Sequence, residues 1–383
     1  MGSGIAQVSA QAGYSTFIFD AQAQQLQKAQ ASLTASLQKL ADKGKITPLQ
    51  QSETHSNLHF VNSLDQLNQC SLVIEAIVEI KEVKQKLFAD LEAIVSPTCI
   101  LATNTSSLAI ASLAATLKFP QRFIGIHFFN PATIMPLVEV IPGLATDKAV
   151  LESAQSIITS WGKTVVIAKD TPGFIVNRVA RSYYGEAIRI AEEQIADYAT
   201  IDWALKTYGG FKMGPFELMD FIGNDINYRV TESVWTQFFF ESRFKPSITQ
   251  QRLFEAGYNG IKSGRGYYEY GEGKTKPLAK EDEALGEYIF QRVIAMLINE
   301  AIDSLYLGIA TKQHLDTAMQ KGVNYPLGLL QWADKIGLAQ VLTTLENLFQ
   351  EYGEDRYRPC VLLKRMVKEN KTLKCQTPPR NAL

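Results

Sequence analysis

The chain has 383 residues, which is enough for two or three domains. Hydrophobic residues make up 46% of the sequence, charged residues make up 20%, and the formal net charge is -1. This balance is typical of a globular protein, and it argues against a nucleic-acid or membrane partner that is bound through bulk charge.

The cysteines and histidines are scattered along the chain. Cys70, Cys99, Cys360 and Cys375 form no CxxC motif, and the four histidines are not at zinc-ligand spacing with them. We therefore expect reduced thiols and no structural metal. No run of eighteen apolar residues is present and the N-terminus does not read as a secretory signal, so we predict a cytoplasmic protein with no membrane span.

The first twenty residues match the second half of a dinucleotide-binding fingerprint. Gly2 and Gly4 precede an apolar, helix-like run, and a short strand follows that ends at Asp20. The glycines would let the backbone approach a pyrophosphate, and an acid at Asp20 would hold the ribose 2′-hydroxyl, which favours NAD over NADP. The first strand of the fingerprint would lie before Met1, so we expect the polypeptide to extend upstream.

Strands and helices then alternate up to about residue 170. The pattern predicts helices at 21–44, after Thr47-Pro48, at 81–94 and up to Trp161. It predicts strands at 58–61, 72–77, 100–103, 123–129, 137–141 and 165–167. This alternation is typical of a mostly parallel, Rossmann-type sheet, which binds ligands at the carboxyl ends of its strands.

Two apolar strands carry one ionisable side chain each, His127 and Glu139. A histidine beside a carboxylate suits a general base and the group that orients it. The alternative is a buried pair that only ties two strands together.

At residues 170–173, D-T-P-G, the pattern changes to long helices, and the helical part is duplicated. An offset of 114 residues places Arg178 on Arg292, Asp202 on Asp316 and Gly214 on Gly328 without a gap. We predict a Rossmann-type domain at 1–170, a helical domain at 171–271, a linker at 272–283 and a second, duplicated helical domain at 284–383. The linker is short, and we expect additional residues between the helical domains.

Seven stretches in chain order resemble one family: G-x-G-I-A-Q, N-T-S-S, H-F-F-N-P, L-V-E-V-I, D-T-P-G-F-I-V-N-R, M-G-P-F-E-L-M-D and K-S-G-R-G-Y-Y-E-Y. The ordered set is similar to the L-3-hydroxyacyl-CoA dehydrogenase family over nearly the whole chain. The doubled helical tail is similar to a bacterial subgroup of that family that acts in phenylacetate breakdown. The resemblance implies NAD-dependent oxidation of an L-3-hydroxyacyl-CoA, such as 3-hydroxyadipyl- or 3-hydroxybutyryl-CoA, to the 3-ketoacyl-CoA.

The resemblance also implies residue roles. His127 would be the base, Glu139 its orienting carboxylate, and Ser106 and Asn177 hydrogen-bond donors to the substrate. The implied NAD-binding residues are Gly2, Gly4, Asp20, Glu79, Lys84, Asn104, Ser106, Asn130 and Lys262, and the implied acyl-CoA-binding residues are Ser36, Lys43, Ser106 and Asn177.

Several of these residues have a plain structural alternative. Ser106 precedes an apolar run and is a candidate helix cap, Asn177 suits a helix surface, and Lys84 and Lys43 suit solvated helix faces. Position 291, the repeat counterpart of Asn177, is Gln, which predicts that the second helical copy lacks the catalytic amide.

Assembly and activity also have alternatives. The family resemblance implies a homodimer, whereas the duplication could supply the same contact within one chain. Two other functions fit the same fold, a dehydrogenase of a free hydroxy acid and a non-catalytic NAD-binding member of the family.

Overall fold

The computed structural model describes residues 1–373, and Cys375 lies outside this part of the chain. The chain forms two compact units, Met1–Asp170 and a second unit that begins at Thr171. Within the described residues, no helix has the length and apolar character needed to cross a membrane.

The first unit contains a two-stranded and a five-stranded sheet. β1 (Thr16–Phe19) pairs in parallel with β2 (Leu58–Val61). The larger sheet has the order β3-β4-β5-β6-β7, with these strands: β3 (Leu72–Glu75), β4 (Ile100–Thr103), β5 (Phe123–Phe128), β6 (Leu137–Pro142) and β7 (Thr164–Ile167). Only the β5–β6 pair is antiparallel. The predicted α/β class is confirmed. The strands form two sheets, because within residues 1–373 no strand bridges β1 and β3.

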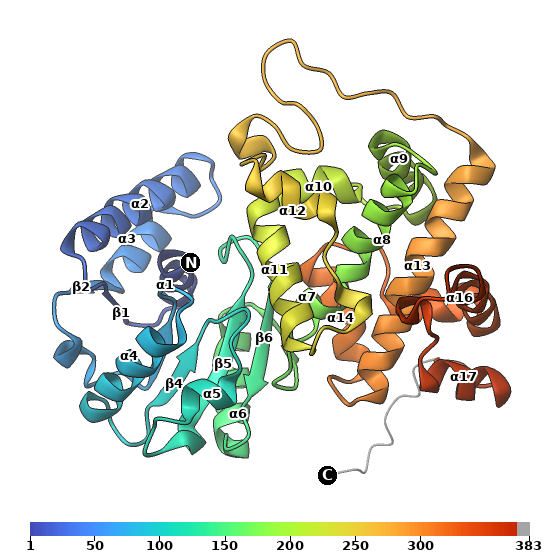
Figure 1. Cartoon of the computed structure of the whole chain (residues 1–383). Coiled ribbons are helices and arrows are strands. Elements are labelled where there is room, and N and C mark those ends of the chain that lie inside the picture. Colours follow the sequence, from blue (N-terminus) through green and yellow to red (C-terminus); the bar gives the residue numbers. More distant parts are fainter. Residues whose placement is uncertain (374–383) are drawn as a thin grey trace. The chain divides into compact units, whose positions relative to one another are not determined.

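The helices of this unit are α1 (Gly2–Gln11), α2 (Ala23–Asp42), α3 (Pro48–Ser56), α4 (Lys81–Ile94), α5 (Ile110–Ala114) and α6 (Lys148–Ser160). Of these helices, α3 and α4 begin at the predicted residues and α2 begins two residues later than predicted. Thr47 caps α3 through a capping box with Gln50, and Pro48 occupies the first turn. Figure 1 shows α1, α2 and α3 beside the two-stranded sheet.

The core of the five-stranded sheet explains its long apolar runs. All six residues of β5 are buried, as are the first five residues of β6. Ile124, Ile126, Val138 and Val140 pack in one cluster with Ile158 of α6. Strands that are covered on both faces must be apolar throughout, so the ionisable residues in them stand out.

The second unit is helical. Its first half contains α7 (Val176–Val179), α8 (Arg181–Glu192), α9 (Tyr198–Gly209), α10 (Pro215–Ile222), α11 (Asn224–Gln237), η3 (Ser242–Phe244), α12 (Ile248–Glu255) and η4 (Ile261–Ser263). Its second half contains α13 (Glu283–Tyr306), α14 (Lys312–Gly322), α15 (Leu329–Ile336), α16 (Leu338–Tyr352), η5 (Asp355–Tyr357) and α17 (Val361–Lys368). Helices α9, α10 and α11 start 114 residues before α14, α15 and α16, as the sequence offset requires. Figure 1 shows α13 as the long helix against which α16 and α17 lie.

Each half has a buried aspartate at the equivalent position, and its carboxylate contacts the N-terminus of the next helix. Asp202 accepts hydrogen bonds from the backbone N–H groups of Phe216 (2.9 Å) and Glu217 (3.1 Å) at the N-terminus of α10. Asp316 does the same at α15, where the donors are Leu330 and Gln331. A carboxylate at a helix N-terminus satisfies N–H groups that have no partner within the helix and complements the helix dipole.

The glycine before each of these helices makes room for the aspartate. A Cβ on Gly214 would lie 2.3 Å from Asp202 Oδ1, and a Cβ on Gly328 would lie 2.2 Å from Asp316 Cγ. The φ of Gly214 is -71°, so the requirement is space and not backbone conformation. These contacts explain why both halves keep this Gly-Asp combination.

We expect Gly214→Ala to lower the free energy of unfolding by about 1–3 kcal/mol, because the buried carboxylate must move away from the new methyl group. Gly185→Ala on α8 is the matched control, since a Cβ there meets nothing within 4 Å. The control should be neutral or stabilising by up to about 1 kcal/mol. Urea unfolding of both variants checks this, and equal midpoints would contradict the steric explanation.

Candidate active site

The centre of the candidate site is a pair of buried side chains on neighbouring strands. His127 of β5 lies directly opposite Glu139 of β6 in the antiparallel register. Their side chains meet, with His127 Nδ1 at 2.7 Å from Glu139 Oε2. His127 is 6% exposed and Glu139 is fully buried. A carboxylate accepts the hydrogen bond here, so Nδ1 carries the proton and Nε2 is the basic nitrogen of the neutral ring.

An amide side chain just after β4 fixes the end of β5, the strand that carries His127. Asn104 Oδ1 accepts a hydrogen bond from the backbone N–H of Phe128 at 2.8 Å, one residue after His127. The Asn104 backbone N–H donates to the Glu75 carbonyl of β3, also at 2.8 Å. The carboxyl ends of β3, β4 and β5 are therefore tied together beside His127.

A buried ammonium group organises the end of β3. Lys84 is 1% exposed, and its Nζ lies 2.6 Å from Glu75 and 3.0 Å from Glu79. Glu75 also accepts hydrogen bonds from Thr103 Oγ1 and the backbone N–H of Ile77. The lysine therefore faces two carboxylates of its own chain. The alternative that Lys84 lies on a solvated helix face is wrong.

Glu79 in turn organises the loop after β4. Its Oε1 accepts hydrogen bonds from Thr105 Oγ1, the Ser106 backbone N–H (3.0 Å) and Ser107 Oγ (3.0 Å). Partial burial alone would raise the pKa of the Glu79 carboxyl, but the Thr105 hydrogen bond and the Lys84 ammonium lower it below its ordinary value. Glu79 is thus ionised at neutral pH and holds the loop that carries Ser106.

The sequence motifs at the ends of β3 and β4 include Glu75 and Thr105, but sequence reasoning assigned no role to Glu75, Thr103 or Thr105. The available signal was a carboxylate as the last residue of an apolar strand, in V-I-E-A-I-V-E, with a lysine nine residues later. A carboxylate at such a position needs a cation or several donors, and both are present here.

The N-terminal part of this unit fits a dinucleotide. Gly2 lies at the start of α1, where backbone N–H groups have no partner within the helix. A Cβ on Gly4 would lie 3.3 Å from the Ala132 Cβ, so a glycine allows α1 to pack closely on the loop after β5. Asp20 is exposed at the tip of β1, and its Oδ1 accepts a hydrogen bond from the Gln22 N–H. A helix N-terminus and an exposed acid at the next strand tip are the two groups that bind the pyrophosphate and ribose of NAD.

The other predicted residues are distributed over both units. Asn130 is exposed in the loop after β5, Lys43 is exposed at the end of α2, and Ser36 on α2 donates a hydrogen bond to Gln7 Oε1 at 3.0 Å. In the helical unit, Asn177 is half-buried on α7, and Lys262 on η4 forms an ion pair with Asp225 at 2.5 Å. The structure brings together Glu79, Lys84, Asn104 and Ser106, while His127 is linked to them through Phe128.

These features define a class of protein. A Rossmann-type unit with a glycine at a helix N-terminus, an acid at the next strand tip and a His–carboxylate pair near the carboxyl end of a central strand is the arrangement of an NAD-dependent dehydrogenase.

Comparison with known proteins identifies the family within that class. Residues 1–171 match the family described as 3-hydroxyacyl-CoA dehydrogenase, NAD binding domain. Residues 173–270 and 288–376 each match the description 3-hydroxyacyl-CoA dehydrogenase, C-terminal domain. The chain belongs to the 3-hydroxyacyl-CoA dehydrogenase family, as the sequence motifs predicted.

Relatives of known name match up to 96% of the chain. The chain is 38% identical to the 3-hydroxyadipyl-CoA dehydrogenase of Escherichia coli K12, with 95% of this chain and 94% of that protein covered. It is 39% identical to a 3-hydroxybutyryl-CoA dehydrogenase of Bradyrhizobium diazoefficiens over 72% of this chain and 94% of that one. The crystal structure of a 3-hydroxybutyryl-CoA dehydrogenase from Escherichia coli K12 matches with a TM-score of 0.90 at 37% identity, covering 96% of each chain.

Proposed function

We propose that this protein oxidises the 3-hydroxyl group of an L-3-hydroxyacyl-CoA to the ketone, with NAD⁺ as the oxidant and His127 as the general base. The observation that carries the proposal is the buried 2.7 Å contact between His127 Nδ1 and Glu139 Oε2 in a family NAD-binding domain. The cofactor supplies the hydride acceptor when it is bound.

His127 would take the hydroxyl proton on Nε2 as the hydride leaves the same carbon. Glu139 keeps the Nδ1 proton in place, which leaves Nε2 as the base, and its negative charge stabilises the imidazolium that forms. Because both side chains are buried, this interaction is stronger than it would be in water. In the reverse direction, the same imidazolium returns the proton to the alkoxide.

Two neutral donors would support the oxygen whose charge changes. The loop that carries Ser106 is held by Glu79, and Asn177 lies on a short helix of the helical unit. Such donors are effective when they are positioned in advance toward the oxygen that gains charge, and one donor contributes roughly 3 kcal/mol in acyl chemistry.

Binding of NAD would use the N-terminal part of the chain and the sheet edge. The N–H groups at Gly2 and Gly4 would face the pyrophosphate, and Asp20 would bind the adenosine ribose. Glu79, Lys84, Asn104, Ser106 and Asn130 would form the nicotinamide side, with Lys262 as a further contact. Lys84 would act there by holding Glu79, because its ammonium lies between two carboxylates.

The acyl-CoA is the part of the proposal that rests on relatives. Proteins that are 38% and 39% identical are named for 3-hydroxyadipyl-CoA and 3-hydroxybutyryl-CoA, so these are the first substrates to consider. Ser36 and Lys43 would contact the coenzyme A portion. The pathway that we propose for this activity is phenylacetate breakdown, as the family resemblance implies.

A substrate panel tests this function. We expect NADH to form, read at 340 nm, with 3-hydroxybutyryl-CoA or 3-hydroxyadipyl-CoA, and kcat/KM to fall at least 100-fold for the corresponding free hydroxy acids, since the acids lack the CoA contacts. NADH formation from free acids with no preference for the thioesters would favour the free-acid dehydrogenase. Binding of NAD⁺ without turnover of any thioester would favour a non-catalytic protein.

A cytoplasmic homodimer completes the proposal. The family resemblance implies dimers that form through the helical domains. In this protein, two helical repeats already pack together within one chain. A homodimer of this protein would therefore use a different surface.

A further inference from the structure

The two helical repeats are joined by a crossed pair of buried ion pairs. Arg178 Nε of the first repeat donates to Glu300 Oε1 of the second at 2.5 Å, and Arg292 Nε of the second donates to Glu186 Oε1 of the first at 2.6 Å. With the 114-residue offset, Arg178 corresponds to Arg292 and Glu186 corresponds to Glu300, so each pair is the repeat counterpart of the other. All four residues are 1–2% exposed, so the two pairs have the same chemistry and the same burial.

The surroundings of the two pairs correspond in part. Glu300 accepts a second hydrogen bond from Arg243 at 3.0 Å, and Glu186 accepts a second one from the Tyr357 hydroxyl at 2.7 Å. Each arginine also lies 5.0 Å from the centre of one aromatic ring at equivalent positions, Phe238 and Tyr352. Arg292 has further partners in Glu193, Tyr352 and Tyr357, so its pair matches the first in position and burial but not in every contact.

The first of these pairs adjoins Asn177. Asn177 and Arg178 lie on α7, a helix of four residues. A single turn has almost no intrinsic stability, so its orientation depends on tertiary anchors. Arg178 anchors it to the second repeat through Glu300, and also through Asp303 at 3.3 Å.

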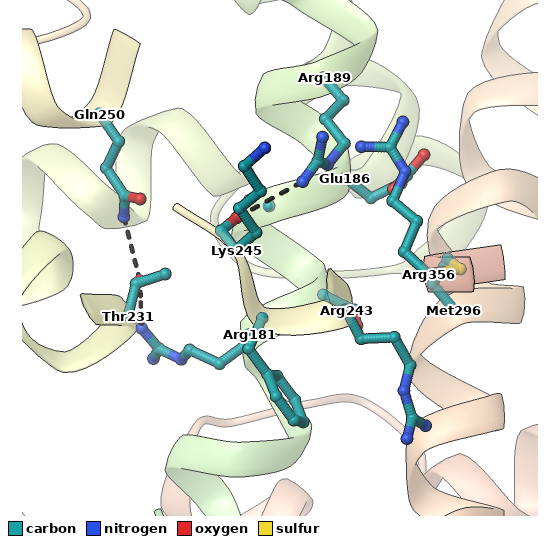
Figure 2. A pocket seen from close by; sticks show the side chains of 12 residues that line it. Arg181, Glu186, Arg189, Thr231, Arg243, Lys245, Gln250, Met296 and Arg356 are labelled. Carbon is teal, nitrogen blue, oxygen red and sulfur yellow. Dashed lines mark hydrogen bonds between the residues drawn. The ribbon is translucent and has the colours of Figure 1, made fainter. Parts of the chain in front are cut away.

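A second anchor holds the same turn to its own repeat. Arg181 Nε donates to the Asn177 carbonyl at 2.8 Å, and its Nη1 donates to Thr231 Oγ1 at 3.1 Å. Figure 2 shows the Arg181–Thr231–Gln250 connection in a hollow that is also lined by Glu186 and Arg243. The Asn177 backbone is therefore fixed from both sides, by Arg181 within the first repeat and by Glu300 across to the second.

The equivalent position in the second repeat differs in two ways. Gln291 replaces the asparagine, and α13 runs without a break through this region, whereas the first repeat divides into α7 and α8. The long helix holds Gln291 by its own backbone hydrogen bonds, so only the copy with Asn177 relies on the crossed ion pair to orient its turn.

We propose that Glu300 of the second helical repeat is a positioning residue for Asn177, acting through Arg178. The second repeat then contributes to the reaction, although its own copy lacks the amide. This inference rests on the proposed function, in which Asn177 donates to the substrate oxygen.

The test compares two matched variants of the full-length chain, Glu300→Gln and Glu186→Gln. Both remove one buried carboxylate charge, so both should lower the melting temperature. The drop should be larger for Glu300→Gln, because Glu300 pairs with two arginines and Glu186 pairs with one. Only Glu300→Gln should lower kcat, by roughly 10- to 100-fold, because a shift of about 1 Å in a positioned group has this effect. The KM for NAD⁺ should not change in either variant.

A double-mutant cycle with Asn177→Ala shows whether Glu300 acts through Asn177. Asn177→Ala alone should lower kcat by about 100-fold or more. If the two residues act as one unit, Glu300→Gln should cause no further loss in the Asn177→Ala background. Should Glu300→Gln fail to fold, Asp303→Asn, which leaves the Arg178–Glu300 contact in place, should give a smaller kcat loss that also disappears in that background.

Three results would overturn the inference, and they can be told apart. Equal kcat losses in Glu300→Gln and Glu186→Gln would mean that the ion pairs act only on stability. An unchanged effect of the Glu300 or Asp303 variant in the Asn177→Ala background would mean that the second repeat acts by another route. A fully active Asn177→Ala variant would remove Asn177 from the proposed function, and the role of Glu300 with it.

Discussion

Replacing His127 with glutamine should lower kcat for NAD-dependent oxidation of a 3-hydroxyacyl-CoA by about 10²- to 10⁴-fold, the range for loss of a positioned general base. Glutamine is close in size to histidine and keeps a polar group beside Glu139, so the β5–β6 pairing should persist. Its amide has no basic nitrogen at neutral pH, so the hydroxyl proton has no acceptor as the hydride leaves. The measurement is steady-state NADH formation at saturating substrate.

His55→Gln is the control for this variant, because His55 is exposed on α3 in the same unit. It should retain the kcat of the unchanged protein. The NAD⁺ dissociation constant and the melting temperature of His127→Gln should both stay close to the original values, which separates lost chemistry from lost folding. A His127→Gln variant with more than one-tenth of the original kcat would remove His127 from the mechanism.

Glu139→Gln should produce a loss of similar size, roughly 10³-fold or more, for a different reason. Glu139 is fully buried and accepts the hydrogen bond of His127 Nδ1. A glutamine can turn its NH₂ group toward Nδ1, which holds the imidazole in the tautomer with its proton on Nε2 and so removes the base. The carboxylate charge that stabilises the imidazolium is lost as well.

Glu152→Gln is the matched control for Glu139→Gln, since Glu152 is an exposed residue of α6 in an ion pair with Lys148. It should leave kcat unchanged. Because Glu139 acts through His127, adding Glu139→Gln to His127→Gln should cause little further loss. Multiplication of the two effects in the double variant would show that Glu139 has a role separate from His127.

Much of the fold follows from local sequence signals. Helix α4 and strands β2 and β4 lie at the predicted residues, because their apolar spacing and breakers are local. His127 and Glu139 were visible as lone ionisable residues in apolar strands, and the register brings them into contact. The family motifs then gave the cofactor and the class of reaction, both of which agree with the family match.

Other features depend on partners that are distant in sequence. The Glu75–Lys84 contact joins the end of a strand to a helix, and K-E-V-K-Q-K looks like a solvated face until burial is known. The duplication was visible in the sequence, but an offset does not reveal that Arg178 pairs across to Glu300. Local pattern also does not show which strands pair, because strand pairing depends on neighbours that are distant in the chain.

The tandem arrangement of the helical repeats also changes what a single substitution can do. In a homodimer with closed symmetry, every substitution at the interface appears twice, once in each subunit. Here each residue of the crossed ion pairs has its own position in one chain and can be substituted alone. The short connection between the repeats also keeps the two halves at an effective concentration in roughly the millimolar range, so dilution does not separate them. One copy can therefore specialise while the other changes independently, as Asn177 and Gln291 illustrate.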